Sequence, residues 1–237
     1  MAKIYVGTSG WAYTSWKPKF YPGKLRSADF LNYYASRLNS VEVNYSFLHS
    51  LTQKMLMEWI DATPANFIFA VKAPQMITHM KRLRGTKRLT RRFVFSLKPL
   101  AQAKKLGPVL FQLPPNFKCD SELLEEFLRG LPRQSRTSFE FRHDSWFGDD
   151  VYDLLRKANV ALCQAESEKL ETPHVQTANF SYLRLRKDSY STRARNALAR
   201  RVAYLGRRGD VYAYFKHEKT PESALHAEAL LAETTRK

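Results

Sequence analysis

The stretch PVLFQLPPNFKCDSELLEEFLRGLPRQSRTSFEFR, from Pro108 to Arg142, contains a strand, a helix and a second strand in that order. Its two ends, Pro108–Leu113 and Thr137–Arg142, are short apolar runs of the kind that buried strands show. Between them, Asp120 or Ser121 supplies a helix N-cap before the amphipathic run ELLEEFLRGL. Two strands joined through a helix are expected to lie parallel in one sheet.

The same alternation continues along the whole chain. Eight runs are expected as strands: Lys3–Gly7, Ser40–Asn44, Phe67–Lys72, Pro108–Leu113, Thr137–Arg142, Val160–Ala165, Phe180–Arg186 and Asp210–Phe215. Helical patterns fill the gaps, but the segment between Ala165 and Phe180 is polar and contains Pro173, so the sixth helix is expected to be weak or irregular.

Eight strand–helix repeats favour one architecture. An open doubly wound sheet is the alternative, but eight repeats in 237 residues fit a TIM-like (β/α)8 barrel better, since that fold typically takes ~250 residues. The expected fold class is therefore α/β, with parallel strands inside an outer ring of helices. No linker or break in composition interrupts the pattern, so residues 1–237 are expected to form a single domain.

Composition excludes several classes of protein. Hydrophobic residues make up 44% of the chain and aromatic residues 13%, which excludes an intrinsically disordered chain. No run approaches 18 apolar residues, and the start MAKIYVG lacks the apolar stretch of a signal peptide, so no membrane contact is expected. Cys119 and Cys163 are too few for a disulfide framework or a four-cysteine zinc site. We therefore expect a cytoplasmic protein.

The net charge of +17 comes from two parts of the chain. No Asp or Glu occurs from Ala62 to Cys119, and most of the twelve Lys and Arg residues there lie in a basic zone at residues 81–105. A second basic zone at residues 184–208 has nine Lys and Arg residues and one acid, Asp188. Such zones are either solvated helix faces or surfaces that receive phosphates. The expected partner is an anionic small molecule or phosphate, and nucleic acid is a second candidate. The pattern gives no oligomeric state.

Polar side chains stand at the carboxyl ends of the predicted strands, where the functional site of such a barrel lies. Ionisable groups inside an apolar barrel are costly unless they are paired or used. The catalytic candidates are Glu42, Lys72, His79, Glu140, Arg142 and His143. The substrate-binding candidates are Ser9, Gly10, Trp11, Asn44, Gln112, Trp146, Arg184 and Lys216.

Our first hypothesis assigns acid–base chemistry to this end of the barrel. Glu140 or Glu42 would act as the general base and one of the two histidines as the acid. Lys72, with Arg142 and Arg184, would hold an anionic group and stabilise developing charge. Each candidate also has a structural interpretation: the carboxylates in ion pairs, the lysine reaching solvent, and the histidines capping loops.

No cofactor is expected. The turn GTSG at Gly7–Gly10 has neither the GxGxxG nor the GxxxxGK[ST] spacing, and no HExxH or CxxC motif occurs. This favours hydrolysis or lysis over redox chemistry. No metal is expected either, although a carboxylate–histidine site from Glu42, Glu140 and His143 is a geometric alternative.

Six segments resemble one known family in the right order along nearly the whole chain: GTSGWAYTSWKPKFYP, YASRLNSVEVNYSF, TPANFIFAVKAPQMITHMKRL, LGPVLFQLPPNF, EFRHDSW and YAYFKHE. They resemble the DUF72 (YecE-like) family. The resemblance implies a TIM-like barrel, distantly similar to those of xylose isomerase and endonuclease IV, and it implies no particular reaction. The family's recurrent polar positions would map to Ser9, Gly10, Trp11, Glu42, Asn44, Lys72, His79, Gln112, Glu140, Arg142, His143 and Trp146.

The chain departs from the family pattern on two strands. Many members have Phe-Asn-Asn on the eighth strand, where this chain has Phe215-Lys216-His217, and Arg-x-His-Gly on the seventh, where it has Arg184-Leu185-Arg186-Lys187. These changes add positive charge or remove a neutral donor at the expected rim. The zinc ligands of the endonuclease IV barrels are not recognisable here, so the resemblance does not extend to nuclease chemistry.

A second hypothesis is a non-catalytic barrel that binds nucleic acid or phosphate through basic zones 81–105 and 184–208. Two arrangements distinguish the hypotheses. Convergence of Glu42, Lys72, Glu140 and Arg142 would favour the enzyme. Divergence of these side chains, with the two basic zones on one face, would favour the binding barrel.

Overall fold

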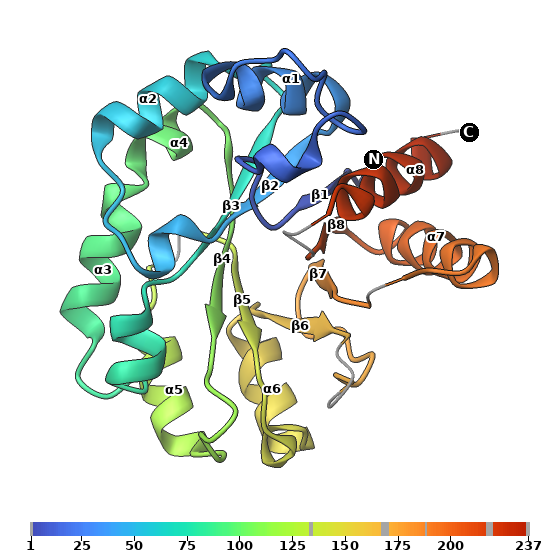
Figure 1. Cartoon of the computed structure of the whole chain (residues 1–237). Coiled ribbons are helices and arrows are strands. Elements are labelled where there is room, and N and C mark those ends of the chain that lie inside the picture. Colours follow the sequence, from blue (N-terminus) through green and yellow to red (C-terminus); the bar gives the residue numbers. More distant parts are fainter. Residues whose placement is uncertain (1, 133–134, 167–170, 188, 217–219, 236–237) are drawn as a thin grey trace.

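The computed structural model describes residues 2–132, 135–166, 171–187, 189–216 and 220–235. Eight strands form one sheet in the order β1-β8-β7-β6-β5-β4-β3-β2, and all paired neighbours are parallel. The strands are β1 (Ile4–Thr8), β2 (Ser40–Val43), β3 (Ile68–Lys72), β4 (Leu106–Gln112), β5 (Thr137–Glu140), β6 (Ala161–Ala165), β7 (Phe180–Leu185) and β8 (Asp210–Phe215). The sheet curls into a nearly closed barrel (Figure 1). This confirms the TIM-like fold, and the strand ends differ from the expected ones by no more than two residues.

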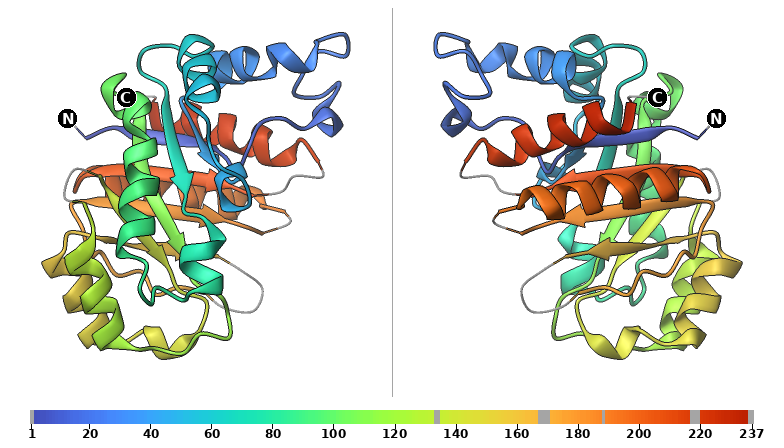
Figure 2. Two further views of the ribbon diagram at one scale, coloured as in Figure 1. Left: turned by 90° about the vertical axis from the view of Figure 1, so that its left-hand side faces the viewer. Right: turned by 90° about the vertical axis from the view of Figure 1, so that its right-hand side faces the viewer.

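Helices surround the barrel (Figure 2). They are α1 (Phe30–Arg37), α2 (Gln53–Asp61), α3 (Lys87–Ser96), α4 (Lys98–Gln102), α5 (Ser121–Gly130), α6 (Asp149–Lys157), α7 (Thr192–Gly206) and α8 (Glu222–Thr235). Thr52, Asp120 and Ser191 cap α2, α5 and α7 through their side-chain oxygens, and of the two caps predicted for α5 the structure uses Asp120. The described residues between β6 and β7, 171–179, contain no helix. No helix in the described part of the chain is both long and apolar enough to cross a membrane.

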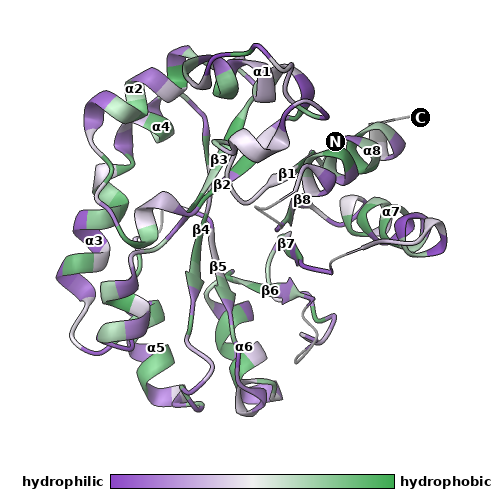
Figure 3. Cartoon of the chain, viewed as in Figure 1, coloured by the Kyte–Doolittle hydropathy of each residue, from purple (hydrophilic) through white to green (hydrophobic). Residues whose placement is uncertain are grey.

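The helices are amphipathic because only one face of each meets the barrel. Along their length the ribbons alternate between hydrophobic and hydrophilic residues (Figure 3). On α5, for example, Leu123, Leu124, Phe127 and Leu128 are buried, whereas Glu126 is exposed. Burial of such an apolar face, rather than helix propensity, supplies most of the stability of a short helix.

Aromatic side chains fill the interior of the barrel below its carboxyl end. The Tyr5 and Tyr212 rings stack at 4.9 Å between centroids, and Tyr182 and Tyr214 lie 5.4 Å apart. Cys163 is buried among the same side chains. The barrel is therefore a packed core rather than a pore, as is usual for this fold, and a cluster of charged side chains lies buried at its carboxyl end.

The barrel closes at the β1–β2 seam by side-chain hydrogen bonds. One backbone bridge, between Ser9 and Glu42, links the two edges. The Tyr34 hydroxyl accepts from Thr8 N at 2.8 Å and donates to Ser40 O at 3.0 Å. These contacts replace ladder hydrogen bonds that the two strands do not make with each other.

Asn39, the residue before β2, supports the same seam by bonding the backbone of β1. Its side chain accepts from Val6 N at 2.8 Å and donates to Ile4 O at 2.9 Å. Gly7 permits the close approach of the two edges. A Cβ at this position would lie 1.8 Å from the carbonyl oxygen of Ser40. The edges can therefore close only without a side chain at residue 7.

We expect Tyr34→Phe to lower the free energy of unfolding by roughly 1–3 kcal/mol, because the buried Thr8 amide loses its partner. Tyr33→Phe, on the same helix, removes only a hydroxyl that accepts from the exposed Arg37 and should change stability by less than about 0.5 kcal/mol. Urea unfolding of both variants measures the difference. Equal losses would contradict this account of the seam.

Candidate functional site

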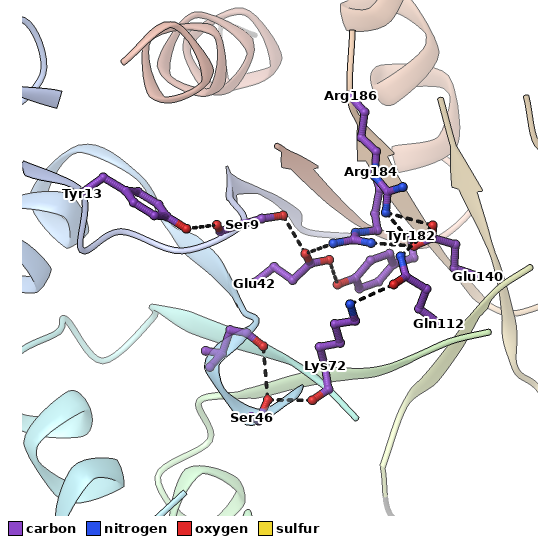
Figure 4. A network of polar contacts seen from close by, with 11 residues as sticks. Ser9, Tyr13, Glu42, Ser46, Lys72, Gln112, Glu140, Tyr182, Arg184 and Arg186 are labelled. Atoms are coloured by element: carbon purple, nitrogen blue, oxygen red, sulfur yellow. Dashed lines mark hydrogen bonds and ion pairs between the residues drawn. The ribbon is translucent and has the colours of Figure 1, made fainter. Parts of the chain in front are cut away.

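The guanidinium of Arg184 lies across the interior of the barrel near its carboxyl end (Figure 4). The residue is 1% exposed. Its Nη2 donates to Glu42 Oε1 at 2.7 Å and its Nη1 donates to Glu140 Oε2 at 2.6 Å. Because the arginine stands on β7 and the carboxylates on β2 and β5, one side chain joins three strands that are not neighbours in the sheet.

Glu42 is fully buried and accepts two further hydrogen bonds. Ser9 Oγ donates to Oε1 at 2.6 Å, and the Tyr182 hydroxyl donates to Oε2 at 2.7 Å. The Tyr13 hydroxyl donates to Ser9 O at 2.8 Å, which fixes the turn after β1. The carboxylate of Glu42 is therefore satisfied by protein groups on both oxygens.

Glu140 is also buried and saturated. Gln112 Nε2 donates to its Oε1 at 2.9 Å, and Arg186 Nη2 lies 2.8 Å from Oε1 and 3.0 Å from Oε2. Arg186 therefore approaches the same carboxylate that Arg184 holds from the other side. A carboxylate between two guanidinium groups is strongly stabilised in its ionised form.

The two carboxylates are poor proton acceptors near neutral pH. Burial alone would raise both pKa values, but the Arg184 charge and the hydrogen bonds outweigh it. The pKa of Glu42 is lowered from its usual range, and the pKa of Glu140 falls to about 2, with Arg186 adding to the effect. The expected role of either residue as general base is therefore disfavoured by its surroundings.

Lys72 ends β3 beside this network and is 8% exposed. Its Nζ donates to Gln112 Oε1 at 2.8 Å and lies 3.8 Å from the centre of the Phe47 ring. No carboxylate in the described part of the chain is within ion-pair distance of it. Burial, followed by the nearby charge of Arg184, lowers the pKa of Lys72 to about 7. A substantial fraction of this amine is therefore neutral at neutral pH.

His79 contacts the same aromatic ring. The His79 and Phe47 rings are perpendicular, with centroids 4.9 Å apart. Burial and then the charge of Lys72 lower the pKa of His79. His79 belongs to a single π-helical turn, Met76–Met80, which leads into Arg82 and Leu83 with φ of 45° and 70°. Such strained geometry without glycine is typical of functional segments.

Further cationic groups surround this cluster. Arg142 is exposed, but its charge acts on His79, and Lys216 is half-buried and its charge acts on Lys72. Within the described residues, three buried polar atoms close to the network have no hydrogen-bond partner, namely Arg184 Nε, Arg186 Nε and Asn44 Oδ1. Unpartnered buried groups of this kind are uncommon in native structures and point to a ligand or water.

Among the expected site residues that lie outside the hydrogen-bond network, four have local roles elsewhere. His143 accepts from Ser145 N at 3.2 Å and caps a short 3₁₀ turn. Trp146 is buried in the outer core, where its ring stacks on Phe141 and its Nε1 donates to Phe117 O. The Trp11 ring packs edge-on against a second tryptophan. Gly10 serves a turn at φ of 97°. The structure therefore gives these residues local packing or turn roles.

Three residues of the network are absent from our expected set: Phe47, Tyr182 and Arg186. The two-residue period of a strand places Tyr182, Arg184 and Arg186 on one face of the expected seventh strand. The sequence pattern could therefore have added Tyr182 and Arg186 to the expected set. Phe47 lies beyond β2 in a 3₁₀ turn, Tyr45–Phe47, where no strand period applies. His217, part of the departure on the eighth strand, lies outside the described residues.

The helices within the two basic zones lie on different sides of the barrel. Four bases of the first zone stand on α3 and four of the second stand on α7, and these helices are on opposite sides (Figures 1 and 2). This follows from their places in the third and seventh of eight units around a ring. The bases of these two helices therefore do not form a single face.

The described residues contain no group of three or more His, Cys, Asp or Glu side chains placed to hold a metal ion. The alternative site from Glu42, Glu140 and His143 is not assembled. Both carboxylates contact arginines, and the histidine turns toward Asp144 at 2.9 Å.

Acid should weaken the fold through Glu140. Since its pKa is lowered from 4.5 to about 2, the unfolded chain takes up the proton first as the pH falls. Stability that is present above pH 4.5 is therefore lost between pH 4.5 and 2, on the order of 3 kcal/mol for this group. Glu140→Gln should flatten the decline of unfolding free energy over this window. Glu125→Gln, which breaks an exposed pair with Arg129, should not, and identical slopes for both variants would contradict the assignment.

The chain is similar in sequence to one protein family and to several known proteins. The family model described as "Protein of unknown function DUF72" matches residues 5–237. The UPF0759 protein YunF of Bacillus subtilis is 33% identical over 157 residues, which cover 63% of this chain and 54% of YunF. The UPF0759 protein YecE of Escherichia coli is 28% identical over 156 residues, 65% of this chain and 54% of YecE. The matched region thus spans about half the length of these relatives.

Solved structures agree with the family match. The crystal structure of a DUF72 family protein from Thermotoga maritima has a TM-score of 0.87 and 27% identity, and covers 97% of this chain and 98% of that one. A DUF72 family protein from Enterococcus faecalis has a TM-score of 0.80 at 20% identity, over 97% and 95% of the two chains, which shows the shared fold. With its polar carboxyl end and nearly closed ring of eight parallel strands, the chain belongs to the DUF72 family.

Proposed function

We propose that this protein is an enzyme that acts on an anionic substrate, phosphate-bearing or carboxylic, by proton transfer at the carboxyl end of the barrel. The proposal is carried by one observation, the buried amine of Lys72 with no carboxylate partner among the described residues. A lysine kept neutral by burial is a general base or nucleophile, which an ordinary surface lysine is not at neutral pH. The reaction class that we favour is hydrolysis or lysis.

In this proposal the proton acceptor is Lys72, and the two glutamates are positioning residues. The neutral Nζ of Lys72 takes the proton from the substrate and becomes an ammonium. His79, whose ring packs against Phe47, is the second group able to exchange a proton. Glu42 and Glu140 keep Arg184 in place, and their low pKa values keep them ionised throughout.

The anionic group of the substrate would be held by the cations around Lys72. Arg142 and Lys216 are accessible from solvent, and Arg186 has an unpartnered Nε. An anion bound here would also stabilise the ammonium that Lys72 becomes when it accepts the proton. In this proposal the net positive charge of the chain attracts such an anion to the protein.

The test is a panel of phosphorylated and carboxylated metabolites incubated with the protein in D₂O, with loss of substrate resonances or deuterium incorporation followed by ¹H NMR. Lys72→Met should lower kcat/KM by roughly 10²–10⁴-fold, the usual range for a general base. Lys98→Met, on the exposed surface of α4, is the matched control and should leave kcat/KM unchanged.

The pH dependence gives a second readout. Since the base must be deprotonated, kcat/KM should rise with pH and level off above about 7, the pKa of Lys72. Unchanged turnover in Lys72→Met, or a rate that does not vary between pH 6 and 8, would contradict the role of this lysine.

A further inference from the structure

A groove of about 490 Å³ opens beside the barrel mouth. It lies between the loop that follows β2, the π-helical turn that follows β3, and α3. Its walls are mainly apolar and include Phe47, Leu48, Met76, Met80, Leu89 and Phe93. A volume in this range is typical of sites for small molecules.

The groove shares a wall with the cluster around Lys72. Phe47 forms part of its wall and also lies 3.8 Å from Lys72 Nζ. Ser46, in the same wall, donates from Oγ to the backbone oxygen of Lys72 at 2.6 Å. The turn that carries His79 contributes Met76 and Met80 to the groove. A molecule in the groove would therefore lie against the residues that hold the proposed base.

The apolar side chains of this wall are unusually open to water. Leu48 is 64% exposed and Met80 is 63% exposed. Single exposed apolar residues need no explanation, but several gathered along one groove are typical of a binding surface. Methionine side chains adapt their shape to varied apolar partners.

We propose that the groove binds the apolar part of the substrate whose anionic group lies at the barrel mouth. The substrate class is then an amphipathic anion: a phosphate or carboxylate joined to an alkyl or aryl chain. The inference rests on the proposed function, because the anionic end is placed by the cations near Lys72. The positive charges around Lys72 and the groove volume of only about 490 Å³ favour this ligand over an amphipathic helix of a protein partner.

The experiment compares octyl phosphate, below its micelle concentration, with inorganic phosphate by isothermal titration calorimetry. Octyl phosphate should bind at least about tenfold more tightly, since two buried methylene groups already supply that factor. Met80→Glu should remove this advantage and leave the affinity for inorganic phosphate within about twofold. Met57→Glu is the matched control, because Met57 is a 44% exposed methionine on α2 outside the groove wall.

Three outcomes are informative. Equal affinity for the two compounds, with both of them bound, overturns the groove inference and leaves the proposed function standing. Equal effects of Met80→Glu and Met57→Glu also overturn the groove inference. Absence of binding of both compounds overturns the proposed function, and the inference falls with it.

Discussion

The ion pairs of Arg184 with Glu42 and Glu140 are the interaction on which the carboxyl end of the barrel depends. Three charged groups are withdrawn from water inside a barrel, and the desolvation cost is large unless every oxygen and most N–H groups find partners. Here the carboxylates are fully satisfied, and the partners come from β1, β4 and β7. Removal of Arg184 would leave Glu42 a buried carboxylate with no arginine partner, which is strongly unfavourable.

That constraint decides which side chains remain available for chemistry. Both carboxylates contact Arg184, and Glu140 also contacts Arg186, so their pKa values are lowered and all of their oxygens accept hydrogen bonds. Lys72 stands at the edge of the same network, where it donates to the amide oxygen of Gln112 and lies over the face of Phe47. The two carboxylates favour its protonated form, but burial and the charge of Arg184 outweigh them and shift it toward the neutral amine. The network thus positions a reactive group instead of supplying one.

Much of the fold was predictable from the sequence, because strand and helix periods differ and each of the eight units repeats the same alternation. The candidate site was predictable only in part. Glu42, Lys72, Gln112, Glu140 and Arg184 follow from strand ends that must meet at one end of a barrel. The direction in which their pKa values shift was not predictable, because it depends on which guanidinium reaches which carboxylate across the interior of the barrel.

Residues beyond the strand ends were harder to place. Trp146 and His143 follow β5 closely, yet the chain turns away there and packs Trp146 outside the barrel. Phe47 enters the site from a turn whose conformation no period predicts. The β1–β2 seam was equally hard to predict. Tyr34 and Asn39 close it through hydrogen bonds to backbone groups far away in the sequence, and such tertiary contacts leave no local pattern.

The central claim is that burial lowers the pKa of Lys72 to about 7, so that a substantial fraction of the amine is neutral at neutral pH. Its most direct test is an NMR titration of the protein labelled with ¹³C at lysine Cε, with the Lys72 resonance assigned by its loss in Lys72→Arg. We expect this resonance to titrate with a midpoint of about 7, while the exposed lysines titrate near 10.5. A Lys72 midpoint near 10.5 would contradict the account.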